Sequence, residues 1–219
     1  MGLTLYGAIL SPYVRKIRIQ LAEQNIDYEL TPVAPFQQPD WYYAISPLGR
    51  IPAIKDGDFT LADSAVIAQY LQDTRKAASL YGDTAEEAAR VRWLEKYADY
   101  ELAPYATFTV FYNRVVAPVK GETSDTAAVE AALTTQLPPL FDYLEAELAN
   151  QPFFLGSRLS LADIAVSCQL INMTHAGEWV DAQRWPGLAG LLGRMIERAS
   201  VALLLPEEQK LVARMTGKA

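Results

Sequence analysis

The sequence predicts two structural parts in one chain of 219 residues: an N-terminal α/β part with a four-stranded mixed sheet, then an all-helical part. Two observations in the N-terminal region support the first part. Short segments there switch between the two-residue period of strands and the three- to four-residue period of helices. An Asp56-Gly57 pair also stands between two apolar runs, which is typical of a tight hairpin. After Thr74 we find only helical periods, which predicts the second part.

The α/β part begins with a strand, and a helix connects this strand to the next one. We expect strands at residues 3–6, 28–31, 52–55 and 59–61, and helices at 12–24 and from 63 or 64 onward. A helical connection makes the first two strands parallel with a right-handed crossover, and the hairpin adds antiparallel strands. We expect residues 32–49 to form a polar, Pro-containing loop. On the last helix we expect these side chains to face inward: Val66, Ile67, Tyr70 and Leu71.

The helical part follows a linker at residues 74–83, and Thr84 and Glu87 have the spacing of a helix-capping box. Apolar stripes predict its helices, and Ser160 to Asp163 form a second capping box. The stripe from Val91 to Leu102 suits either the core or a subunit interface. We therefore predict parts at residues 1–78 and 86–219.

Composition excludes several functional classes. A hydrophobic content of 51% is too high for a disordered chain. Nineteen basic residues against 26 acidic ones give a net charge of −7, so nucleic acid and anionic membranes are unfavourable partners. With one histidine and one cysteine, Cys168, we expect neither a disulfide nor a metal site, and Cys168 in its apolar stretch is expected to be a buried thiol. No signal peptide or spanning segment is evident, so we expect a cytoplasmic protein.

The turn at Ser11-Pro12 is the most informative segment for chemistry. Pro12 suits the first turn of a helix, where its missing N–H costs nothing. Ser11 then lies beside unpaired backbone N–H groups and the positive end of the helix dipole. It can simply cap its helix, or it can donate a hydrogen bond to an anion bound there.

Two further segments have the same kind of position. Pro52 at the first position of a strand leaves the neighbouring backbone unpaired, so the Ile51 peptide can bind an extended ligand, especially if the Ile51–Pro52 bond is cis. Asp63 and Ser64 place a carboxylate and a hydroxyl at another helix start. A carboxylate there can also hold an ammonium group of a ligand.

With these three segments in this topology, the sequence resembles the glutathione transferase family along nearly its whole length, and in particular its cytosolic, serine-type, bacterial-like members. The resemblance implies a thioredoxin-like N-terminal domain, an all-helical C-terminal domain and a homodimer. It also implies Ser11 as the active-site residue, with Arg50, Ile51, Pro52, Asp63 and Ser64 binding glutathione, the co-substrate. The family usually has Glu or Gln where this chain has the shorter Asp63. Tyr6 offers a tyrosine-type alignment, but Ser11 fits better.

The resemblance implies activation of the glutathione thiol for attack on a small apolar electrophile. Tyr13 and an aromatic segment with Tyr105, Phe108 and Tyr112 are candidates for contacting that electrophile, although such a segment also suits a core. Relatives with cysteine at this turn carry out thiol–disulfide exchange. This chain has no cysteine at the turn, so we do not expect that reaction. Alternatives are a glutathione-dependent peroxidase, an isomerase, or a non-catalytic interaction partner. The isomerase is disfavoured because Ile9-Leu10-Ser11 lacks the Ser-Ser-Cys run of the zeta class.

Overall fold

The computed structural model describes residues 2–35, 38–75 and 77–217. The other positions are 1, 36, 37, 76, 218 and 219. They belong to the predicted parts, loop or linker and lie outside the described residues. The chain divides into two compact units, Met1–Leu80 and Tyr81–Ala219. The first unit contains the sheet and the second is helical. The predicted fold class is therefore confirmed.

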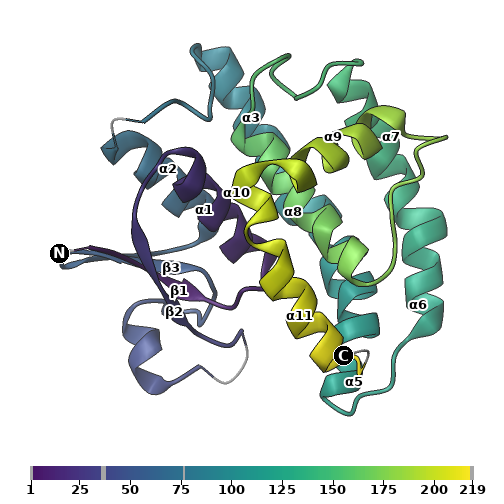
Figure 1. Ribbon diagram of the computed structural model, residues 1–219, viewed down its shortest axis with the longest axis horizontal. Coiled ribbons are helices and arrows are strands. Elements are labelled where there is room, and N and C mark those ends of the chain that lie inside the picture. The colour runs from purple at the N-terminus through teal and green to yellow at the C-terminus, as the bar shows by residue number, and fades with distance from the viewer. Residues whose placement is uncertain (1, 36–37, 76, 218–219) are drawn as a thin grey trace. The chain divides into compact units, whose positions relative to one another are not determined.

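The first unit is a mixed sheet with helices on both faces (Figure 1). Its elements are β1 (Leu3–Gly7), α1 (Pro12–Glu23), β2 (Tyr28–Pro32), the 3-10 helix η1 (Asp40–Ala44), β3 (Ala53–Asp56), β4 (Phe59–Ala62) and α2 (Ser64–Thr74). The strand order among the described residues is β2-β1-β3-β4. The β1–β2 pair is parallel and the other two pairs are antiparallel, as predicted. In Figure 1, α1 and α2 lie on one side of the sheet and η1 lies on the other.

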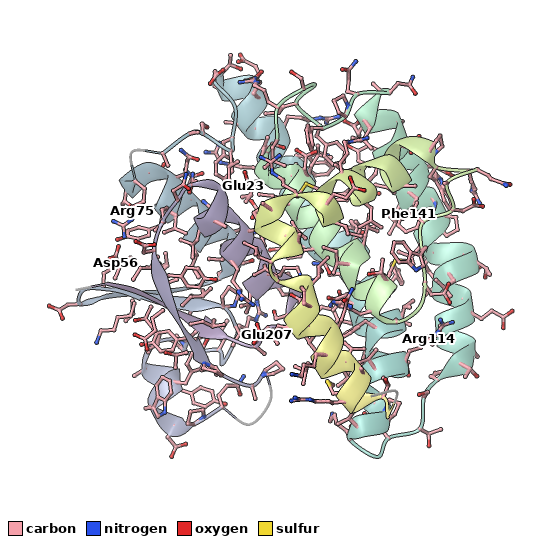
Figure 2. The ribbon with its side chains drawn as sticks, viewed as in Figure 1. Glu23, Asp56, Arg75, Arg114, Phe141 and Glu207 are labelled. Carbon is pink, nitrogen blue, oxygen red and sulfur yellow. The ribbon has the colours of Figure 1, made fainter. Side chains whose placement is uncertain are left out.

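Local sequence explains where these elements begin and end. Pro12 occupies the first turn of α1, and Asn25 after its end has a φ of 53°, a left-handed conformation that Asn tolerates better than most residues. Gly57 takes a φ of 63° in the turn between β3 and β4, which explains the Asp-Gly signal. At the same hairpin, Arg75 forms an ion pair with Asp56 at 2.5 Å; both residues are labelled in Figure 2.

The structure corrects two expectations in this unit. The stretch predicted as loop contains η1, a short helix that begins after Pro39. On α2, Val66 is 50% exposed and does not face inward, whereas Ala65 and Ala68 are buried. These small alanines allow α1 and α2 to pack closely, and the Gln20 amide nitrogen donates to the Ala68 carbonyl at 2.9 Å. Close packing at the alanines turns Val66 toward solvent.

The second unit consists of helices, several of them continuous with π-helical segments. They are α3 (Ala85–Tyr97), η2 (Ala98–Leu102), α4 (Ala103–Tyr105), η3 (Ala106–Val116), α5 (Ala117–Val119), α6 (Thr126–Ala131), η4 (Ala132–Gln136), α7 (Leu137–Leu148), α8 (Leu161–His175), α9 (Pro186–Glu197), α10 (Ala199–Ala202) and α11 (Leu205–Met215). Helix α8 contacts α3, η2, η3 and α9, so it forms the centre of this unit. The labelled helices can be followed in Figure 1.

The Val91 to Leu102 stripe belongs to the core. Val91, Leu94 and Leu102 are buried, and α3 packs against α8. The capping box at the start of α8 also forms, because Asp163 accepts a hydrogen bond from the Ser160 amide at 2.8 Å.

Candidate functional site

The three polar segments singled out in the sequence meet at one end of the sheet. Tyr6 near the end of β1 pairs with Ala53 at the start of β3, and Ala53 pairs with Ala62 at the end of β4. Because both pairings are antiparallel, the C-terminal ends of β1 and β4 and the N-terminal end of β3 lie side by side. Ser11 follows β1, Ile51 and Pro52 precede β3, and Asp63 and Ser64 follow β4. The sheet topology therefore brings all three segments together.

Ser11 is the N-cap of α1. Its hydroxyl oxygen accepts a hydrogen bond from the Val14 amide at 3.4 Å, which is long for such a bond. Within the described part of the chain, no acceptor lies within hydrogen-bond distance of the Ser11 hydroxyl hydrogen. The end of β1 packs closely against α1, since a Cβ on Gly7 would come within 2.3 Å of a Val14 methyl carbon. Ser11 thus caps its helix weakly and keeps a donor available.

The Ile51–Pro52 peptide bond is cis, which meets the condition stated for an open Ile51 peptide. Two buried residues hold the carbonyl just before it: the Tyr42 and Ser46 hydroxyls each donate to the Arg50 carbonyl oxygen at 2.8 Å. In the described residues, neither the amide nor the carbonyl of Ile51 has a hydrogen-bond partner. This peptide is therefore fixed on one side and open to an extended ligand on the other.

Sequence reasoning missed Tyr42 and Ser46. Burial raises the pKa of Tyr42 to about 12, so its phenol remains a hydrogen-bond donor throughout the neutral range. Tyr42 also belongs to a small core on the η1 face of the sheet, where it packs with Val33 and Ala53. The Trp41-Tyr42-Tyr43 run signals an aromatic cluster, but no local pattern distinguishes the buried tyrosine from its exposed neighbours.

Asp63 is the N-cap of α2 and has an unusual backbone conformation. Its φ is 80°, in the left-handed region that non-glycine residues rarely occupy and that is enriched at functional sites. One carboxylate oxygen, Oδ1, accepts from the amides of Ala65 at 3.0 Å and Val66 at 3.3 Å. For the described residues, Oδ2 and the hydroxyl of the buried Ser64 have no partner. Asp63 therefore caps the helix with Oδ1, and Oδ2 makes no hydrogen bond within the described residues.

Two other candidate residues in this unit, Arg50 and Tyr6, have different surroundings from these groups. Arg50 is exposed, and its guanidinium has no ion-pair partner among the residues described. Tyr6 packs its ring on the η1 face, 5.8 Å from the Trp41 ring and 6.2 Å from the Tyr42 ring. The Tyr6 side chain thus belongs to the aromatic cluster beneath the sheet.

The candidate electrophile-contacting residues are not core residues. Phe108 is 56% exposed, and Tyr105 and Tyr112 are half-buried. The Tyr112 hydroxyl bonds with Glu122 and accepts from the Lys120 ammonium at 3.0 Å. In the first unit, half-buried Tyr13 lies in the first turn of α1, with the Lys16 ammonium 5.9 Å from its ring centroid.

Cys168 is buried in α8, as expected. Over residues 2–35, 38–75 and 77–217, no group of three or more His, Cys, Asp or Glu side chains is placed to hold a metal ion. A search of the same residues finds no helix with the length and apolar character needed to cross a membrane.

Comparison with known proteins identifies the family. Residues 5–79 match the model of the glutathione S-transferase N-terminal domain, and residues 126–194 match that of the C-terminal domain. Glutathione S-transferase 4 of Zea mays is 30% identical, covering 94% of this chain and 97% of the relative. Elongation factor 1-gamma of Schizosaccharomyces pombe is 35% identical over 76% of this chain but only 40% of its own length.

A solved structure agrees with these matches. The apo form of human glutathione-S-transferase T1-1 superimposes with a TM-score of 0.85 and 29% identity, covering 99% of this chain and 91% of that chain. Together with the two domain models and the relative from maize, this similarity extends over both units. The chain therefore belongs to the glutathione S-transferase family.

Proposed function

We propose that this protein is a serine-type glutathione transferase that activates the glutathione thiol for attack on a small apolar electrophile. One observation carries the proposal: a free hydroxyl donor, an open peptide and an unoccupied carboxylate oxygen occur together at one end of the sheet. These groups complement a cysteinyl thiolate, a peptide backbone and an ammonium group, and glutathione contains all three.

In this proposal Ser11 donates its hydroxyl hydrogen to the bound thiolate. A free cysteine thiol has a pKa of ~8.5, and lowering it by ~2 units requires ~2.7 kcal/mol of preference for the anion. A hydrogen bond to a charged acceptor supplies ~1.5–3 kcal/mol, and the start of α1 adds ~0.3–1 kcal/mol. The thiol proton leaves to solvent, and the sulfur then forms a bond to the electrophilic carbon. In a substitution, the bond from this carbon to its leaving group breaks and the group departs as an anion such as chloride; in an addition, the displaced electron pair moves to the neighbouring atom, which takes a proton from solvent. No protein base is needed.

The other residues position glutathione. The Ile51 peptide pairs with the cysteinyl backbone, with Pro52 setting its direction. Asp63 Oδ2 and the Ser64 hydroxyl bind the γ-glutamyl group, and Arg50 binds a carboxylate. We further propose that Tyr13, Tyr105, Phe108 and Tyr112 contact the electrophile, and that the protein is cytoplasmic and forms a homodimer.

A retention and turnover experiment tests this function. We expect the protein to bind glutathione resin and to turn over members of a panel of chloronitrobenzenes, isothiocyanates and hydroperoxides. Turnover of hydroperoxides alone would favour a peroxidase. The similarity to elongation factor 1-gamma gives a competing hypothesis, a non-catalytic interaction partner. Retention on the resin without turnover of any substrate would support that hypothesis and contradict the proposed function.

The Ser11→Ala variant tests the role of the hydroxyl. We expect this variant to stay on the resin, because the groups that bind the peptide are intact. Its conjugation rate near neutral pH should fall about tenfold or more, as expected for loss of a hydrogen bond to a charged group. The rise of the rate with pH should move to higher pH. Ser79→Ala, a variant outside the sheet end, serves as the matched control, and an unchanged pH–rate profile in Ser11→Ala would reject the assigned role.

A further inference from the structure

Two amide side chains interrupt the buried helix α8 on the side that faces η3. Gln169 is 1% exposed and Asn172 is fully buried. The two residues are three positions apart, so they share one face of the helix. Helix α8 packs along η3, the π-helical segment at Ala106–Val116. A buried amide costs free energy unless it is hydrogen-bonded, so both side chains need polar partners inside the fold.

Thr107 of η3 is a partner for both amides. Its hydroxyl donates to the Gln169 side-chain oxygen, Oε1, at 2.6 Å and accepts from the Asn172 side-chain nitrogen, Nδ2, at 3.2 Å. Thr107 is itself only 6% exposed, so both hydrogen bonds are buried. Buried polar groups that satisfy one another favour a single arrangement of the elements that carry them. We call these three residues the η3–α8 network.

Other threonines in the π-helical segments use their hydroxyls differently. Thr109 of η3 donates to the Pro104 carbonyl at 2.8 Å. Thr134 of η4 donates to the Glu130 carbonyl at 2.8 Å. Both bonds go to the preceding turn of the same continuous helix, which is usual for threonine in a helix. Thr107 instead bonds to another helix, and so it fixes the rotation of η3 relative to α8.

The rotation of η3 decides which side chains this segment presents to the surface. Thr107 and Val110 are buried, whereas Phe108 is 56% exposed. Most π-helical segments are single turns and many occur at functional sites, but η3 contains 11 residues. A change of η3 from π-helical to α-helical bonding would turn Phe108 and Tyr112 relative to α8. The η3–α8 network opposes such a change because it holds Thr107 in place.

From these contacts we propose that Thr107, Gln169 and Asn172 are positioning residues for the electrophile. Their network fixes η3 and thereby the direction in which Phe108 and Tyr112 point. This inference rests on the proposed function, in which these two aromatic residues contact the electrophile. The network includes no residue to which we assign glutathione binding. It therefore governs the second substrate and leaves the binding of glutathione unchanged.

Thr107→Val tests the inference, because valine has nearly the same shape but forms no hydrogen bond. With chlorodinitrobenzene as the electrophile, we expect kcat/KM for this substrate to fall about tenfold, since small misplacements of substrate contacts reduce rates by up to ~100-fold. KM for glutathione should change less than about twofold. Thr107→Ser keeps the hydroxyl and should recover most of the loss. Thr134→Val is the matched control, because the Thr134 hydroxyl bonds within its own helix.

Hydrogen exchange gives a second readout that does not require turnover. In Thr107→Val, the backbone amides of residues 106–116 should exchange about tenfold faster, as expected when a buried hydrogen bond is lost. The amides of α7, at Leu137–Leu148, should exchange as they do in the wild type. Equal acceleration in both segments would indicate a general loss of stability and would overturn the inference.

Together the two measurements separate failure of this inference from failure of the proposed function. If the wild type is active and Thr107→Val keeps its kinetic constants, or loses kcat/KM and glutathione affinity equally, the network does not position the electrophile. If the wild type turns over no electrophile of the panel, the proposed function is wrong and the positioning role is wrong with it. In that case, unchanged exchange of residues 106–116 would further show that the network does not hold η3.

Discussion

Tyr42 is a buried side chain that fixes the backbone of the proposed glutathione site. Its hydroxyl holds the Arg50 carbonyl together with that of Ser46, and this orients the adjacent Ile51 peptide. The ring is fully buried in the small core on the η1 face, so the hydroxyl has little freedom to move. Tyr42 is thus a positioning residue in the proposed site and does not itself need to touch glutathione.

Replacing Tyr42 by Phe removes this hydrogen bond and keeps the ring. We expect glutathione to bind about fivefold more weakly, because a typical hydrogen bond contributes ~1 kcal/mol and Ser46 still holds the carbonyl. Isothermal calorimetry measures the change, and Tyr43→Phe is the control, since the Tyr43 hydroxyl donates to the half-buried Gln38 side chain at 3.3 Å and, in the described residues, makes no hydrogen bond to the Arg50 carbonyl. Equal affinities in Tyr42→Phe and wild type would show that the Arg50 carbonyl needs no such support.

At this scale, the sequence reveals residues whose position in a helix or turn explains their chemistry. Ser11 and Asp63 could be proposed because both are good N-cap residues placed after strands. Tyr42 could not, because its hydrogen bond to Arg50 depends on how the chain folds between them. The positive φ of Asp63 was equally hidden, since no sequence pattern predicts it.

Among the elements, the start of α8 depends on a buried carboxylate. Asp163 accepts hydrogen bonds from the Ser160 amide, the Ser160 hydroxyl at 2.6 Å and the Phe154 amide at 2.9 Å. Burial nevertheless dominates and raises the pKa of Asp163 from 3.8 to about 6. At pH values between 3.8 and about 6, the Asp163 carboxyl group is therefore protonated to a greater extent in the folded state than in the unfolded state.

This shift predicts a direction for stability. Where the folded state binds more protons, the free energy of unfolding falls as pH rises. The contribution of Asp163 is therefore largest below the unfolded pKa and is lost as pH rises toward about 6. Between pH 7 and pH 5 we expect the stability difference between wild type and Asp163→Asn to grow in favour of wild type by ~1 kcal/mol.

Urea unfolding of both proteins at pH 7, 6 and 5 measures this difference. Groups that titrate in both proteins contribute equally to the two free energies of unfolding, so their contributions cancel in the difference. The Asn variant has no carboxyl group to titrate, so it supplies the control within the same experiment. A difference that stays constant, or that shrinks as the pH falls, would contradict the raised pKa.

The elements also show what periodicity can and cannot predict. The Asp-Gly hairpin and the end of α5 before Gly121 follow from backbone preferences of single residues, so they were predictable. The orientation of α2 was not predictable. Ala65 and Ala68, which pack against α1, suit an exposed face of a helix as well as a buried face. Helix η1 was missed because a five-residue helix has too few turns to show an apolar period.

For the whole molecule, the exposed aromatic cluster of the helical unit is the best candidate for a subunit interface. The cluster comprises Trp93, Tyr97, Tyr100 and Tyr143: the Trp93 indole donates to the Tyr143 hydroxyl at 2.7 Å, and the Tyr97 and Tyr143 rings are 4.7 Å apart. Trp93 and Tyr100 are more than half exposed. The stripe from Val91 to Leu102 is buried in the core, whereas Trp93 and Tyr100 remain at the surface of this unit.

If the proposed homodimer uses this cluster, charges placed on it should separate the subunits. We expect wild type to sediment as a dimer and the Trp93→Glu/Tyr100→Glu double variant as a folded monomer, because two carboxylates per chain would otherwise be buried. Leu203→Glu, at an apolar residue that is even more exposed, should remain a dimer. A dimeric double variant would exclude this cluster as the interface.

In the proposed function, the sheet end of the first unit binds glutathione and stabilises its thiolate through Ser11. The most direct measurement is a titration of enzyme-bound glutathione, following the ultraviolet absorbance of the thiolate, in wild type and Ser11→Ala. We predict a bound-thiol pKa ~2 units below that of free thiol in wild type and a return most of the way toward ~8.5 in the variant. If the thiol of the wild-type complex titrates like that of free glutathione, or if both proteins lower its pKa equally, Ser11 does not stabilise the thiolate.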